Sequence, residues 1–156
     1  MKGEQSYSIT LKNNESEKEA IQFLIDKDHS FLNPSKESRK LVMELLNLVK
    51  RNSRAFDLIL IPGQSNLNEI IKLKQNDKIT LVELKTTKKE LPNNPAGFFF
   101  GATENEFKLA DLLGDKYKFC FVTLHENSSS YKLLTLNELE PLIKTKRIQY
   151  QINLKR

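Results

Sequence analysis

The stretch Ile79-Thr80-Leu81-Val82-Glu83-Leu84-Lys85 decides the fold, because it joins the composition of a buried strand to two charged side chains. An unbroken run of Ile, Leu, Val and Thr is typical of a strand inside a sheet. Such a strand seldom carries an unpaired charge, because losing the hydration of that charge costs much free energy. Alternation along a strand places Glu83 and Lys85 on one face and Leu84 on the other. The stretch therefore predicts a buried strand with a polar site on one face.

A second apolar stretch, Ala55-Phe56-Asp57-Leu58-Ile59-Leu60, carries one carboxylate, Asp57. A buried salt bridge with Lys85 is the structural alternative for either carboxylate taken alone. We expect Asp57, Glu83 and Lys85 to converge at the edge of a sheet. Two carboxylates and an ammonium group at one place suit a divalent metal ion and a hydrolytic water.

Periodicity and turn signals around these stretches alternate between helix and strand. On the N-terminal side we expect a strand at residues 7–11, a helix at 16–25 that a capping box of Ser16 and Glu19 begins, and a helix from about 33 to 49. Strands are expected at 56–61, 67–74 and 78–87, with a hairpin turn at 76–77. After a loop at 91–97 we expect a helix at 103–113 that Gly114 ends, strands at 117–124 and 131–134, a helix at 137–144 and a strand at 148–154. This order predicts an α/β fold, with a mixed sheet flanked by helices, in one domain.

Composition excludes several other classes of protein. The formal net charge of +5 permits a polyanionic partner without requiring one. The single cysteine, Cys120, allows no internal disulfide, and with His29 and His125 far apart in the sequence it offers no zinc pattern. No apolar run approaches membrane-spanning length and no signal peptide is recognisable, so we expect a soluble, cytoplasmic protein without a membrane partner.

At its charged strands the chain resembles the PD-(D/E)xK nuclease superfamily, which has the restriction-endonuclease-like fold. The match consists of Asp57 and of Glu83-Leu84-Lys85, with Phe56 where the name of the superfamily has proline. The resemblance implies an αβββαβ core with terminal additions. It divides the single domain into an N-terminal addition at 1–30, a catalytic core at 33–124 and a C-terminal addition at 125–156.

A second resemblance covers residues 81 to about 122. Four segments are similar to the NO VEIN C-terminal-like domain: Val82-Glu83-Leu84-Lys85-Thr86-Thr87, Phe98-Phe99-Phe100, Glu104-Asn105-Glu106-Phe107 and Leu113-Gly114-Asp115-Lys116-Tyr117. That domain is usually counted in the same superfamily and often occurs in restriction or DNA-processing proteins. The resemblance does not extend to the N-terminal third of the chain.

The superfamily resemblance implies a magnesium site. Asp57 and Glu83 would bind Mg²⁺, for which Mn²⁺ can substitute, and the backbone carbonyl of Leu84 would be a third ligand. Lys85 would orient the attacking water or stabilise developing negative charge. Many nucleases of this fold carry a further glutamate on the helix before the aspartate strand, and the candidates are Glu37 and Glu44. An ordinary solvent-facing glutamate is the alternative for each of them.

Residues after the catalytic strand are candidates for contacts with nucleic acid. The exit of the strand is basic and rich in hydroxyl groups, which suits phosphate binding, and a solvated loop is the alternative; its residues are Lys85, Thr86, Thr87, Lys88 and Lys89. On the later helix, Asn105 and Glu106 match the family pattern. Glu106 faces either the metal site or the DNA backbone on that interpretation, and the alternative is capping of the helix N-terminus.

Together these patterns predict a Mg²⁺-dependent endonuclease that hydrolyses DNA, either as a restriction-type enzyme or as a structure-specific nuclease. RNA remains open as a substrate, and so does a small-molecule hydrolase on the same scaffold. Cleavage of a duplex would imply a homodimer, because one active site cuts one strand at a time. The alternative function is a non-catalytic nucleic-acid- or protein-binding module that retains the fold. The presence of Asp57, Glu83 and Lys85 together favours the enzyme.

Overall fold

The protein folds around a five-stranded mixed sheet in the strand order β1-β2-β3-β4-β5. The computed structural model describes the backbone of residues 2–156 and the side chains from residue 15 onward. The strands are β1 (Phe31–Leu32), β2 (Leu58–Leu60), β3 (Thr80–Thr87), β4 (Tyr117–Thr123) and β5 (Ser130–Leu134). Strands β3 and β4 are parallel, and the other neighbouring pairs are antiparallel. The expected α/β class and mixed sheet are confirmed.

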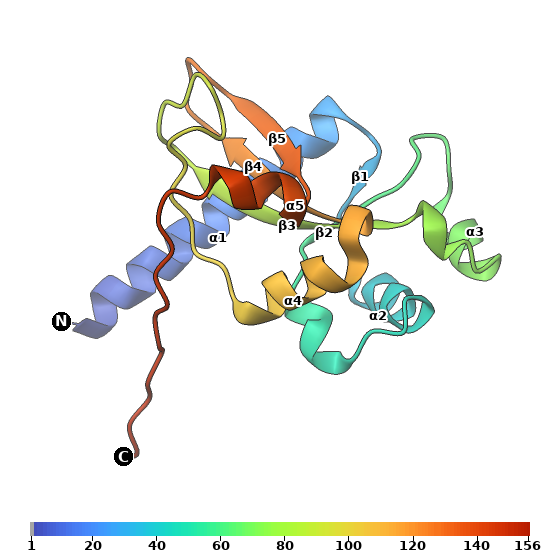
Figure 1. The fold of residues 1–156 in the computed structure, drawn as a ribbon, viewed down its shortest axis with the longest axis horizontal. Coiled ribbons are helices and arrows are strands. Elements are labelled where there is room, and N and C mark those ends of the chain that lie inside the picture. Colours follow the sequence, from blue (N-terminus) through green and yellow to red (C-terminus); the bar gives the residue numbers. More distant parts are fainter. Residues whose placement is uncertain (1) are drawn as a thin grey trace.

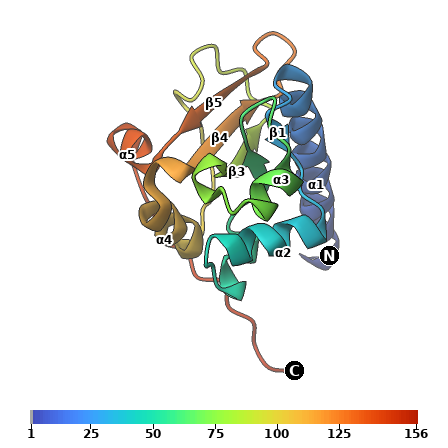
Figure 2. The same cartoon turned by 90° about the vertical axis from the view of Figure 1, so that its right-hand side faces the viewer.

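Helices cover both faces of this sheet. They are α1 (Lys2–Lys27), α2 (Lys36–Leu45), α3 (Leu67–Lys72), α4 (Glu104–Leu113) and α5 (Leu136–Leu139), with short 3₁₀ helices at Lys50–Arg54, Asn76–Lys78, Gly114–Lys116 and Glu140–Leu142. Figure 1 shows α1 crossing the sheet, and Figure 2 shows that it lies on the opposite face from α4 and α5. Within residues 2–156 no helix is both long enough and apolar enough to cross a lipid bilayer.

The alternation of β3 divides its side chains between two apolar cores. Leu81 packs with residues of α2, α3 and α4 in the larger core. Val82 and Leu84 pack with Ala20 and Leu24 of α1 in the smaller one. Glu83 and Lys85 follow Leu81 at two-residue steps, so they lie on the face that α4 covers. The expected separation of Leu84 from the two charged side chains is therefore confirmed.

Some expected helix boundaries are confirmed, but the helix expected from about 33 to 49 ends early, at Leu45, because the chain turns at Asn47, which has a φ of 55°. Ser35 caps α2 by accepting a hydrogen bond from the backbone of Ser38. Helix α4 begins after Thr103 and ends at Gly114, which has a φ of 55° in the left-handed region that glycine tolerates. These signals are local, so the sequence alone is enough to place them.

Three expected strands, at residues 7–11, 67–74 and 148–154, are not strands in the structure. Residues 7–11 lie within α1, which begins at Lys2, so Ser16 and Glu19 are inside a helix and do not begin one. Residues 67–74 form α3, because the Asn66 side chain caps its first turn and Ile70 is buried on one face. The turn expected at 76–77 is a 3₁₀ helix. Strand β1 was not expected, since two residues carry no periodicity.

Residues 148–154 form no strand, although their apolar side chains alternate. Ile148, Tyr150, Ile152 and Leu154 are 79–83% exposed. Figure 1 shows this C-terminal segment leaving the body of the protein after α5. The alternating pattern needs a neighbouring strand to become a β-strand, and no strand of the described chain pairs with it.

Candidate active site

The register of β2 and β3 brings Asp57 and Glu83 together. Leu58 is paired with Val82, so Asp57, one residue earlier, comes opposite Glu83. The backbone N–H of Asp57 donates to the Val82 carbonyl at 2.8 Å, next to the last residue pair of the β2–β3 ladder. The N–H of Leu84 then donates to Asp57 Oδ2 at 2.8 Å. Asp57 is therefore fixed at both its backbone and its carboxylate.

Arg39 of α2 holds the Asp57 backbone from the other side. Its guanidinium donates to the carbonyl oxygens of Ser53 at 3.2 Å, Phe56 at 2.7 Å and Asp57 at 2.9 Å. It also stacks on the Phe56 ring at 4.4 Å from the ring centroid. A rigid guanidinium fork with several acceptors loses little entropy per hydrogen bond, so it suits a positioning role. Sequence reasoning missed Arg39, because its partners are distant carbonyl groups.

Lys85 joins the carboxylates of two different elements. Its Nζ lies 3.2 Å from Glu83 Oε1 and 2.5 Å from Glu106 Oε1 on α4. The side chains of Lys85 and Glu83 are each 10% exposed and that of Glu106 is 5% exposed. Although burial lowers the pKa of Lys85, the charges and hydrogen bonds of Glu83 and Glu106 raise it above its usual value. Lys85 is therefore a cation at neutral pH.

Glu106 caps helix α4, as the structural alternative expected, and also contacts Lys85. Its Oε2 accepts hydrogen bonds from the backbone and hydroxyl of Thr103, at 2.9 and 2.7 Å, which completes the capping box of α4. Its Oε1 binds Lys85. Burial raises the pKa of Glu106, but the hydrogen bonds from Lys85 and Thr103 outweigh burial and hold it below its usual value. Glu106 is thus an ionised carboxylate that ties α4 to β3.

The other two carboxylates bind protons more tightly than usual. Burial, followed by the nearby charge of Asp57, raises the pKa of Glu83 to about 10. Burial also raises the pKa of Asp57, against the opposing effects of hydrogen bonding from the Leu84 N–H and from protonated Glu83 and of the charges of Lys85 and Arg39. Glu83 Oε2 is buried and has no hydrogen-bond partner among the described residues. At neutral pH, a proton on Glu83 therefore separates the two carboxyl groups when no cation is bound.

Glu17 of α1 is a further carboxylate near this site. It is partly buried, and burial and the charge of Asp57 raise its pKa, whereas Arg39 and Lys85 lower it. Sequence reasoning missed Glu17, but a signal was present. Glu17, Ala20 and Leu24 are spaced i, i+3 and i+7, so a carboxylate lies on the stripe of α1 that packs on the sheet.

Glu37 and Glu44, the sequence candidates for this further carboxylate, are exposed on α2. Arg39 of the same helix points at Asp57. At 100° per residue, Glu37 and Glu44 are turned about 160° and 140° away from Arg39. The structure thus brings Glu17, and not these two residues, to the charged cluster.

The candidate nucleic-acid contacts divide into a buried and an exposed group. Glu106 is buried, Thr86 and Thr87 are half-buried, and Lys88, Lys89 and Asn105 are exposed. Lys88 and Lys89 follow the end of β3, where the Thr87 hydroxyl accepts a hydrogen bond from the Lys89 backbone at 3.2 Å. Their ammonium groups are therefore free to meet a phosphate near the exit of the strand.

The residues present fit a magnesium ion held by few protein ligands. Among the side chains of residues 15–156, no three His, Cys, Asp or Glu groups are arranged as a complete metal site. Magnesium keeps several waters and is usually bound by one or two carboxylates, so Asp57 and Glu83 suffice. Leu84 directs its N–H to Asp57, and the carbonyl of a strand residue points to the same side as its N–H. The Leu84 carbonyl therefore points to the side of β3 on which Asp57 lies.

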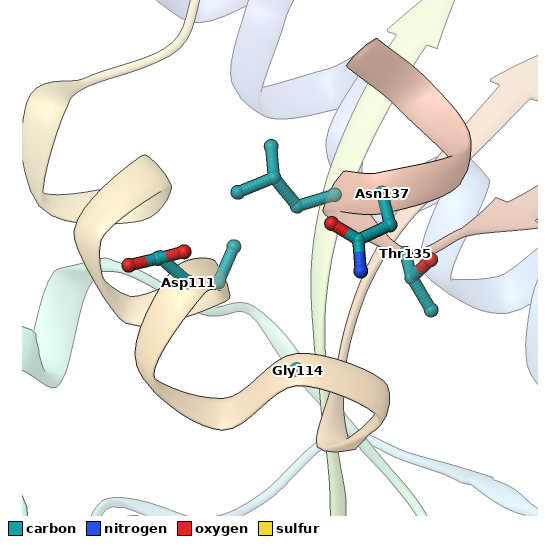
Figure 3. Close-up of a pocket in the computed structure, with 6 residues that line it drawn as sticks. Asp111, Gly114, Thr135 and Asn137 are labelled. Carbon is teal, nitrogen blue, oxygen red and sulfur yellow. The ribbon is translucent and has the colours of Figure 1, made fainter. Parts of the chain in front are cut away.

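A small cavity lies away from this charged cluster. It has a volume of about 60 Å³ and is lined by Ala110, Asp111, Gly114, Thr135, Leu136 and Asn137. Figure 3 shows it between the last turn of α4 and the first residues of α5. It contains none of the charged residues of the site and is large enough only for small molecules such as water. We therefore assign it no part in the chemistry.

Comparisons with protein-family models, curated proteins and solved structures found no match to this chain. The geometry of the site and the resemblance of its motif are therefore the two indications of its function.

Removing Glu106 is expected to destabilise the protein, since Lys85 would lose a buried partner. For Glu106→Ala we expect the free energy of unfolding to fall by about 3–5 kcal/mol. Glu106→Gln should lose less, because glutamine can still accept the Thr103 hydrogen bonds. Urea unfolding measures both. Glu104→Ala is the matched control on the same helix, because its ion pair with Lys108 is 68–81% exposed and is worth less than about 1 kcal/mol. Equal stability losses for Glu104→Ala and Glu106→Ala would contradict the assignment.

Proposed function

We propose that this protein is a Mg²⁺-dependent endonuclease that hydrolyses DNA phosphodiester bonds. One observation carries the proposal. The half-buried carboxylate of Asp57, directly before β2, and the buried carboxylate of Glu83 on β3 meet beside a buried ammonium group, and Glu83 Oε2 has no partner in the described chain. A buried pair of like charges is unfavourable unless a proton or a cation separates them. Such a pair with Lys85 suits a metal site better than a structural salt bridge, which would need only one carboxylate.

The order of elements supports a restriction-endonuclease-like arrangement. Helix α1 precedes three successive antiparallel strands, and α4 then leads to β4, which runs parallel to β3. This is an αβββαβ order in which α2 and α3 are insertions between the strands. The first core helix is then α1 and not the helix expected from residue 33. Glu17 would accordingly be the further glutamate of the first helix.

The charges of the cluster suit a divalent cation. Four carboxylates and two cationic groups lie close enough to shift the pKa values of one another. When all six are ionised, the cluster has a net charge of two negative charges. Asp57, Glu83 and the Leu84 carbonyl would hold the ion. Bound there, Mg²⁺ would lower the pKa of a water and neutralise charge on the phosphate.

The residues around this position would have the other roles in the proposed hydrolysis. Lys85, which stays protonated, would donate hydrogen bonds to the attacking water or to a phosphate oxygen as negative charge grows there. Glu106 fixes the Lys85 ammonium, and Arg39 fixes the Asp57 backbone. In the reaction, a bond forms between the water oxygen and phosphorus while the bond to the 3′ oxygen breaks. Lys88 and Lys89 would contact neighbouring phosphates.

Removal of the Lys85 charge tests this proposal directly. Lys85→Gln retains a hydrogen-bond donor for Glu83 and Glu106, so we expect the chain to fold. Cleavage of supercoiled plasmid with Mg²⁺ or Mn²⁺ should fall by about 10²–10³-fold relative to wild type. EDTA should stop wild-type cleavage, and added Mg²⁺ should restore it. A folded wild-type protein that neither cleaves DNA nor binds Mg²⁺ would refute the nuclease and favour a binding module. Nicked or linear product from duplex DNA would show whether two sites act together.

A further inference from the structure

We propose that Phe99 stacks on an unpaired nucleobase next to the scissile phosphate, so that the preferred substrate is DNA with unpaired bases at the cut. This inference rests on the proposed nuclease function. Phe99 is 90% exposed, the most exposed of the large apolar side chains among residues 15–156. A single exposed apolar residue is common on protein surfaces, but this ring is distinguished by its position and by the residues that hold it there.

The neighbours of Phe99 turn its ring to the outside. The rings of Phe98 and Phe100 both pack edge-on against Phe121, each with a centroid distance of 5.0 Å. They also contact each other at 6.2 Å. Since these two side chains fill the space over β4, the ring between them has no place in the core. Its exposure is fixed by the packing of the segment.

The same segment lies at the edge of the candidate active site. The Phe100 ring centroid is 6.0 Å from Lys85 Nζ. A few residues later, Thr103 is hydrogen-bonded to Glu106, which binds Lys85. Figure 1 shows this yellow segment descending to the start of α4. Phe99 therefore directly precedes a segment that is held near Lys85 at Phe100 and, through Glu106, at Thr103.

An unpaired nucleobase is the partner that an exposed aromatic ring at this position would bind. Single-stranded nucleic acids are bound by aromatic rings that stack on their bases, beside cationic groups that contact the phosphates. Here the cationic groups are Lys88 and Lys89, exposed at the end of β3. In a duplex the faces of each base are covered by its neighbours, so a protein ring reaches a base face only after that base leaves the stack. Phe99 therefore favours single-stranded DNA, or DNA with a flipped base, over intact duplex.

The chain contains no tryptophan, so Phe99→Trp introduces a unique fluorophore at this position. We would titrate this variant with a single-stranded oligonucleotide and with the matched duplex, using Ca²⁺ in place of Mg²⁺. Quenching by the single strand and not by the duplex is the expected result. Tyr150→Trp, at a side chain that is 80% exposed in the C-terminal segment, is the control and should show no such difference.

Kinetics provide the second readout. Phe99→Ala should raise KM for single-stranded DNA by about 5- to 150-fold and leave kcat nearly unchanged, because it removes one stacking contact. Phe99→Tyr should restore the wild-type KM. Wild-type cleavage with unquenched Phe99→Trp, or quenching that is equal for both DNA forms, would overturn the stacking proposal alone. Strand-selective quenching without any cleavage by wild type would support stacking and refute the nuclease.

Discussion

Asp57→Asn is expected to reduce metal-dependent DNA cleavage by about 10³-fold or more. Asparagine is close in shape to aspartate, and its side-chain oxygen can still accept the hydrogen bond that the Leu84 N–H donates at 2.8 Å. The substitution therefore removes the negative charge while it keeps the connection between β2 and β3. Without that charge, Glu83 would be the only carboxylate on these strands to hold Mg²⁺, and the metal would bind weakly. Plasmid cleavage and Mg²⁺ titration calorimetry would measure the two effects separately.

Asp111→Asn is the matched control for this experiment. Asp111 is exposed on α4, lines the small cavity and lies outside the charged cluster (Figure 3). The control should cleave DNA and bind Mg²⁺ as wild type does. Circular dichroism would establish that Asp57→Asn is folded. A folded Asp57→Asn protein with wild-type cleavage would show that the metal site lies elsewhere or that the reaction needs no charge at this position.

In the absence of metal, stability is expected to fall as the pH rises from about 5 to 9. Glu83 in the folded protein has a pKa of about 10, raised from the usual value of 4.5 by burial and by Asp57. Between these pH values the unfolded chain has lost the proton that the folded protein keeps, so raising the pH favours unfolding. The slope is about 1.4 kcal/mol per pH unit for one such proton. The raised pKa values of Asp57 and Glu17 act in the same direction.

Glu83→Gln should remove most of this slope, because glutamine has no proton to lose. Thermal unfolding across this pH range would measure the slopes of wild type and variant. In wild type, Mg²⁺ should displace the proton, so its affinity should rise with pH, and calorimetry in buffers of different ionisation enthalpy should detect proton release. A wild-type stability that rises between pH 5 and 9 without metal would contradict the raised pKa of Glu83.

The predictions from sequence succeeded where the signal was local. Alternation in β3 placed Glu83 and Lys85 on one face, and Gly114 marked the end of the helix that was expected to begin at residue 103. They failed where one sequence pattern is compatible with more than one structure. The expected strands at 67–74 and 148–154 both have apolar residues that fit a strand. However, residues 67–72 are capped as a helix, and residues 148–154 have no neighbouring strand to pair with.

The sequence by itself determined the α/β class, the two charged strands and the capped helix that follows them, because periodicity and capping act within a few residues. Only the tertiary structure decided which distant groups meet. It set Asp57 opposite Glu83, joined Lys85 to Glu106, and brought Arg39 and Glu17 to the cluster in place of Glu37 and Glu44. These contacts depend on strand register and on how helices pack across the sheet. Many distant contacts together fix both, and no local pattern encodes them.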